Sequence, residues 1–143
     1  MKKLLLIVIA VVFGSIFSLN AQNNLKNADV EYTANTRGFY QKIKLKGQML
    51  SFTNDRNDTL MQNETKISSK DFLYLNTEFK KIKLVGISKL KPPTSKRQYD
   101  GAAIADLKIV YSEKTYQTQS FDNGYPNIKI KKFVDKLISL VKK

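Results

Sequence analysis

Alternating apolar and polar residues predict a β-hairpin with one dry face in the first half of the chain. Phe39, Ile43 and Leu45 share one face of the first strand, and lysines cover the other face. Lys46-Gly47 suits a tight turn into a second strand, residues 49–53.

The second half of the chain carries the same pattern. Residues 103–111 keep their apolar side chains at one parity, and residues 112–114 would reverse the chain into a strand over residues 115–121. Residues 29–34 also alternate and predict an extended segment before the first hairpin. A short strand over residues 59–62 is only weakly marked.

Two segments have the spacing of an amphipathic helix. The first covers residues 69–80, with Ser68 and Ser69 as candidate caps, and the second follows Pro126. The apolar positions are Phe72, Leu75 and Phe79 in the first helix, and Ile130, Phe133, Val134, Leu137 and Val141 in the second.

The order of these elements predicts a single α+β domain over residues 29–143. Written as ββ(β)-α-(β)ββ-α, it is a small antiparallel sheet of two hairpins with two helices packed on one face. Residues 82–90 are expected to leave the first helix as a short extended segment. Pro92-Pro93 then breaks the pattern and opens a loop that ends at Gly101.

The N-terminal residues have the organisation of a secretory signal peptide over residues 1–21. Lys2 and Lys3 precede the apolar run Leu4–Phe13, and the small residue Ala21 stands at the expected cleavage point. The apolar stretch is shorter than the roughly 20 residues that cross a bilayer, and no lipid-anchoring cysteine is present. We therefore expect a periplasmic or secreted protein with no membrane span after cleavage, and a flexible leader over residues 22–28.

Composition excludes several kinds of chemistry. The 143-residue chain contains no Cys, His or Trp, so disulfides, thiolate or imidazole metal ligands and imidazole bases are absent. No nucleophile motif or phosphate-binding loop occurs, and Asp100 and Asp106 read better as a turn residue and a solvent-facing strand residue. The cluster at residues 54–58 lacks the order of a calcium loop. We expect no enzyme activity and no cofactor.

Among the overall properties of the chain, the formal net charge of +13 is the one that points most clearly to a function. Lys42, Lys44 and Lys46 line one face of a strand and are candidate ligands for an anionic polysaccharide or an acidic surface. The alternative is that they only keep the strand soluble. Nucleic acid is disfavoured as a partner by export and by the lack of a binding module.

The tripeptide Asp58-Thr59-Leu60 matches a short acceptor pattern for O-glycosylation in some exported bacterial proteins. Thr59 is therefore a candidate glycosylation site.

The order of the elements resembles that of emfourin, a family of small protein inhibitors of thermolysin-like metallopeptidases. The residues that carry the resemblance are Gly38-Phe39, Phe72, Leu75 and Phe79, the hairpin 107–121, and Pro126 before a Leu-rich final helix. The chain also looks like a broad set of small, uncharacterised exported proteins of Gram-negative bacteria. The first resemblance implies inhibition of a peptidase.

A protein inhibitor offers an ordered loop or a strand edge to its enzyme, and the two candidates for that role are residues 91–101 and the turn over residues 54–58. The proline pair of the first candidate would lower the entropy lost on docking. The alternative for residues 91–101 is a plain connection. The candidate partner-binding residues are Lys91, Pro92, Pro93, Thr94, Lys96, Arg97 and Tyr99. The sequence thus predicts an exported, non-enzymatic binding domain whose partner is a peptidase or another envelope protein. The alternative is binding of an anionic envelope polymer through the lysine face.

Overall fold

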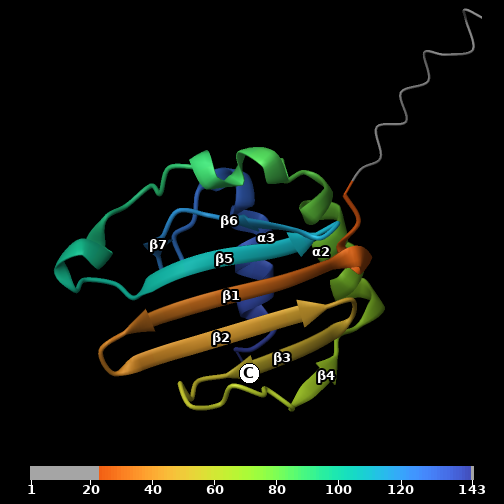
Figure 1. Cartoon of the computed structure of the whole chain (residues 1–143), viewed down its shortest axis with the longest axis horizontal. Coiled ribbons are helices and arrows are strands. Elements are labelled where there is room, and N and C mark those ends of the chain that lie inside the picture. Colours follow the sequence, from red (N-terminus) through yellow and green to blue (C-terminus); the bar gives the residue numbers. More distant parts are fainter. Residues whose placement is uncertain (1–22, 143) are drawn as a thin grey trace, which may run out of the picture.

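The computed structural model describes residues 23–142, and Figure 1 shows their arrangement. The expected signal peptide, residues 1–21, lies outside the described residues. The strands are β1 (Ala28–Thr36), β2 (Phe39–Lys46), β3 (Met49–Thr53), β4 (Glu64–Lys66), β5 (Ile104–Tyr111), β6 (Lys114–Gln117) and β7 (Phe121–Asp122). The α-helices are α2 (Ser69–Lys80) and α3 (Ile128–Ser139), and the 3-10 helices are η1 (Leu25–Asn27), η2 (Leu84–Lys89) and η3 (Lys96–Tyr99).

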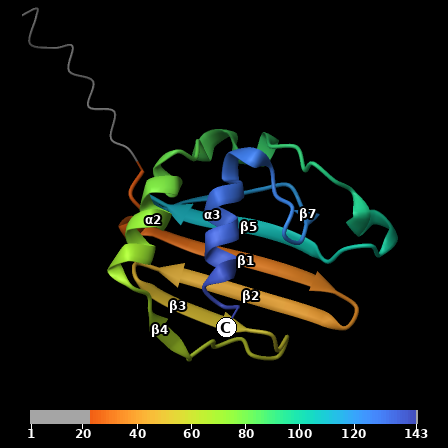
Figure 2. The same ribbon diagram turned by 180° about the vertical axis from the view of Figure 1, so that it is seen from behind.

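The strands form one antiparallel sheet in the order β4-β3-β2-β1-β5-β6, with β7 paired to β5. Both α-helices lie on the same face of the sheet, and α3 crosses the middle strands (Figure 2). Within residues 23–142, no helix covers the opposite face (Figure 1). The predicted α+β class, with two hairpins and two helices on one face, is confirmed.

Strand β1 joins the two hairpins at the centre of the sheet. Tyr32 lies opposite Ile43 of β2 on one side and Leu107 of β5 on the other. Because side chains alternate across a strand, this register puts every second residue of the three strands on the helix-covered face. The buried strand residues on that face are Ala28, Val30, Tyr32, Ala34, Ile43, Leu45, Ala105, Leu107 and Ile109.

Aromatic and aliphatic side chains of the helices close this core. Phe79 of α2 packs against Phe133 of α3 with ring centroids 5.8 Å apart, and both rings are buried. Ser68 caps α2 by accepting a hydrogen bond from the amide of Asp71 at 3.1 Å. Asn127 caps α3 in the same way, so Pro126 stands one residue before the cap.

Two expectations for the connecting segments were wrong. The strand expected at residues 59–62 is a loop, in which Met61 has a φ of 47° and donates its amide to Asp58 Oδ1; the short strand is β4 instead. Residues 84–89 form η2 rather than extended backbone. Leu84 and Ile87 are three residues apart, and a 3-10 helix puts such residues on one side, where both are buried.

The strand expected over residues 115–121 is interrupted at Thr118. The Thr118 hydroxyl accepts a hydrogen bond from the amide of Leu107 at 3.1 Å, while its own amide donates to the Leu107 carbonyl at 3.0 Å. A side chain thus replaces one backbone acceptor of the ladder, and the pairing with β5 resumes only at β7.

The expected flexible leader, residues 22–28, was wrong wherever the structure describes it. Leu25 is 0% exposed and belongs to the core cluster. Its amide donates to Asn76 Oδ1 of α2 at 3.0 Å, and Ala28 already begins β1. The buried Leu25 side chain and the hydrogen bond to Asn76 attach the segment to α2.

Candidate functional site

The proposed partner-binding loop forms one continuous arm between η2 and β5, beyond the end of the sheet (Figure 1). Its middle is the short helix η3, and Gly101 closes the turn by donating its amide to the Lys96 carbonyl at 2.8 Å. Tyr99 is 70% exposed, whereas Thr94 and Arg97 are half-buried and turn toward the protein. The candidate residues of this loop are therefore brought together by the structure.

The carboxylate of Asp122 in β7 holds the arm in place. This side chain is 0% exposed and accepts four hydrogen bonds from the arm. The Thr94 hydroxyl donates at 2.6 Å, the amide of Lys96 at 2.8 Å and that of Arg97 at 2.9 Å, and the Arg97 guanidinium at 3.2 Å. One buried acid thus satisfies a hydroxyl, two backbone donors and a cation.

Two further hydrogen bonds complete the arm. The Arg97 guanidinium also donates to the Thr94 carbonyl at 2.7 Å, and the side-chain amide of Asn127 donates to the Lys91 carbonyl at 2.8 Å. The arm is tied at its base to the start of α3 and in its middle to β7. These ties make it a pre-ordered loop.

The sequence pattern missed Asp122, because it stands in Asp122-Asn123-Gly124, a typical turn sequence. Strand alternation gives no signal for its burial either. Phe121 and Asp122 are consecutive, and in a strand consecutive side chains face opposite sides, so one of them would normally be exposed. Both are buried here, because the arm covers the second face of β7.

The arm changes the acid–base behaviour of Asp122. Burial by itself raises the pKa of this carboxyl, but the hydrogen bonds from Thr94, the two amides and Arg97 outweigh burial and lower the pKa to about 2. The carboxylate is therefore the form that holds the arm at all pH values above that range.

This pKa predicts a loss of stability in acid. A carboxyl with a depressed pKa in the folded state stabilises the fold fully above its unfolded pKa, and this contribution disappears as the pH falls through the folded pKa. As the pH falls from about 4 to about 2, protonation of Asp122 should lower the free energy of unfolding by about 2 kcal/mol. Urea denaturation at several pH values measures this fall, which should be smaller in Asp122→Asn; equal falls in both proteins would contradict the assignment.

The lysine face lies on the side of the sheet that no helix covers. Lys42 and Lys44 of β2, together with Lys108 of β5, surround Glu31 of β1, with nitrogen–oxygen distances of 3.8, 3.9 and 3.6 Å. Lys46 is 4.0 Å from Asp29. Each of the three candidate lysines thus has an acidic neighbour, but Lys42, Lys44 and Lys108 share the single Glu31, so the acids offset only part of the positive charge of this face.

The other residues considered from the sequence are placed in turns and strands. Asp55 accepts a hydrogen bond from the amide of Asn57 at 2.9 Å, so its carboxylate shapes a turn. Asp106 lies on β5 and accepts from the Ser120 hydroxyl at 2.8 Å. Thr59 is exposed in the loop before β4, next to Leu60, which is 75% exposed, so the candidate glycosylation residue is accessible.

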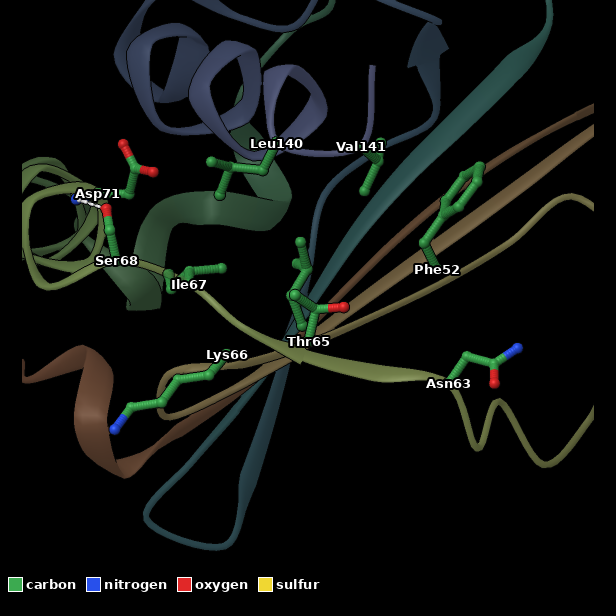
Figure 3. A pocket seen from close by; sticks show the side chains of 10 residues that line it. Phe52, Asn63, Thr65, Lys66, Ile67, Ser68, Asp71, Leu140 and Val141 are labelled. Atoms are coloured by element: carbon green, nitrogen blue, oxygen red, sulfur yellow. Dashed lines mark hydrogen bonds between the residues drawn. The ribbon is translucent and has the colours of Figure 1, made fainter. Parts of the chain in front are cut away.

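A further groove was not anticipated from the sequence. It is an open groove of about 550 Å³ between β3, β4 and the ends of the two α-helices (Figure 3). Apolar side chains of Phe52, Ile67, Leu140 and Val141 line it.

The polar groups of this groove are already occupied by structural roles. Asp71 pairs with Lys136 of α3 at 2.7 Å, and hydrogen bonds from Lys136 and Ser68 lower the pKa of its carboxyl. Ser68 in turn caps α2. An ion-paired carboxylate with a lowered pKa is a poor general base.

The chain matches no family model, and neither a curated protein nor a solved structure matches it. The resemblance to emfourin therefore stays a prediction. Among residues 23–142, no helix is long and apolar enough to cross a membrane. Nor does that part of the chain contain a cluster of three or more acidic side chains that would hold a metal ion.

Proposed function

We propose that the chain is an exported, non-enzymatic binding domain that presents residues 91–101 to a partner protein, and that this partner is a peptidase. The observation that carries the proposal is the buried Asp122, which accepts four hydrogen bonds from a surface arm and holds it in one conformation. A pre-ordered loop loses little entropy on docking, which is the property that a protein inhibitor needs.

The surface around the arm has the composition of a protein interface. Tyr99 projects from the arm with 70% of its surface exposed, and Tyr125, next to β7, is 57% exposed. Ile104, the first residue after the arm in β5, is 45% exposed. Exposed tyrosines are among the residue types that anchor protein–protein contacts.

The test uses residues 22–143, which include every described residue, and a thermolysin-like metallopeptidase. The protein should lower peptidase activity in proportion to its concentration, at physiological and at high salt, because a packed interface is little screened. Tyr99→Ala should weaken inhibition about tenfold or more, as expected for an aromatic anchor. Tyr74→Ala, which removes an exposed tyrosine of α2 far along the chain from the arm, is the matched control.

A pull-down from the native envelope and secreted fractions extends the same test to other peptidases. A peptidase retained at both salt concentrations by the wild type and lost with Tyr99→Ala supports the proposal. Retention that is the same for Tyr99→Ala and Tyr74→Ala would exclude the arm as the binding surface.

The second candidate function is binding of an anionic envelope polymer through Lys42, Lys44 and Lys46. Its support is the alternation along β2, in which Ile43 and Leu45 are buried while the lysines point to the other face of the sheet. The two functions respond differently to salt: retention of an acidic polymer should disappear at high salt, and replacing the three lysines by glutamine should abolish it without changing peptidase inhibition. Because Glu31 and Asp29 already neutralise part of this face, we rank it second.

A further inference from the structure

A cavity of about 390 Å³ lies between the end of α2, the helix η2 and the start of α3. Its lining combines two kinds of side chain. Ile82, Leu90 and Ile130 give it an aliphatic floor, whereas Lys81, Lys83 and Lys129 stand around it. Two of the floor residues, Ile82 and Ile130, are almost fully buried, so the floor belongs to the packed core.

The cavity carries an uncompensated positive charge. Lys81 lies 2.9 Å from Glu78, but Lys83 and Lys129 form no ion pair within residues 23–142. Among the described residues that line the cavity, none is acidic. The lysine face of β2 differs in this respect, because each of its lysines has an acidic neighbour.

We propose that this cavity binds a small single-chain amphiphile with an anionic head, a carboxylate or a phosphate, free in solution. The head would pair with Lys83 and Lys129, and a short aliphatic chain would pack on Ile82, Leu90 and Ile130. Charge complementarity selects the head, and the aliphatic floor selects the chain. The volume is within the range of roughly 300–1,000 Å³ that small-molecule sites occupy. The proposal is independent of the arm at residues 91–101.

The test measures binding of octanoate and octyl phosphate, below their aggregation concentrations, to residues 22–143 by calorimetry, with octanol as the neutral probe. Both anions should bind more tightly than octanol. Lys83→Gln and Lys129→Gln should each weaken anion binding about fivefold to tenfold and leave octanol unaffected. Lys114→Gln, on β6 and outside the cavity, is the matched control and should change nothing.

A steric variant tests the cavity without changing its charge. Gly86 lines the cavity, and a Cβ added there meets no atom within 4 Å, so Gly86→Val adds bulk without a clash at Cβ. This variant should weaken binding of all three probes.

A separate measurement tests binding to vesicles that contain phosphatidylglycerol, a membrane-bound anion. The proposal would be overturned if octanol bound as tightly as the two anions, or if anion binding were unchanged in both lysine variants. It would also be overturned if the protein bound only to the vesicles. The last result would assign the lysines to a membrane surface instead.

Discussion

Replacing Asp122 by asparagine should release the arm at residues 91–101 and destabilise the protein. Asparagine has the same shape, but it loses the charge that pairs with Arg97 and turns an NH₂ group toward backbone donors. Breaking a buried pair in this way leaves an uncompensated cation and unsatisfied amides. We expect the free energy of unfolding in urea to fall by about 2–4 kcal/mol.

Asp100→Asn is the matched control for this substitution. Asp100 is exposed in the same arm and has a φ of 60°, a left-handed conformation that asparagine tolerates well. Its loss of stability should stay within about 0.5 kcal/mol. Hydrogen exchange gives a local readout: the amides of Lys96 and Arg97 should exchange much faster in Asp122→Asn. If they stay as protected as in the wild type, Asp122 does not hold the arm.

Release of the arm also separates the structural role of Asp122 from the proposed function. Asp122 is fully buried and cannot touch a partner, so any loss of peptidase inhibition in Asp122→Asn must come through the loop it orders. At low temperature, where the variant stays folded, inhibition should therefore weaken while the rest of the core remains intact. Unchanged inhibition with a mobile arm would move the interface elsewhere.

The second large effect is expected at Leu25, in the segment that the sequence assigned to a flexible leader. Its side chain is fully buried in the core cluster. Leu25→Ala should lower the free energy of unfolding by about 2–4 kcal/mol, because it removes buried apolar surface and leaves a cavity. Denaturant unfolding measures the loss.

Lys26→Ala tests the neighbouring exposed position as the control, and its effect should lie within about 0.5 kcal/mol. A loss for Leu25→Ala as small as this would show that the segment does not dock. Truncation variants intended to remove a leader should therefore keep Leu25 and the residues after it.

Strand β2 and the two helices show how far periodicity alone reaches. In β2, buried Ile43 and Leu45 alternate with lysines that point outward. Helix α3 buries apolar residues at helical spacing, among them Ile130, Phe133, Val134 and Leu137. Such patterns are local consequences of which face must leave water, so they can be read without knowing the partners.

The candidate sites depended on contacts that no local pattern contains. Alternation along β2 predicted correctly that the lysines share one face of the strand. The neighbours of these lysines, Glu31 and Lys108, come close to them only through strand pairing. Asp122 stands in a typical turn sequence, and its partners Thr94 and Arg97 lie 28 and 25 residues earlier in the chain. The cavity at Lys83 and Lys129 likewise joins segments that are far apart in sequence.

The amino-acid sequence by itself determined the class of fold, the two hairpins and the two helices, because side-chain alternation and helical spacing are set within a few residues. It also determined which imidazole and thiol chemistry the protein lacks. Only the tertiary structure decided that Leu25 belongs to the core and that Asp122 orders the arm. It also decided that Glu31 and Asp29 offset part of the charge of the lysine face. Burial, ion pairing and hydrogen-bond satisfaction depend on neighbours from distant parts of the chain, and folding alone brings these together.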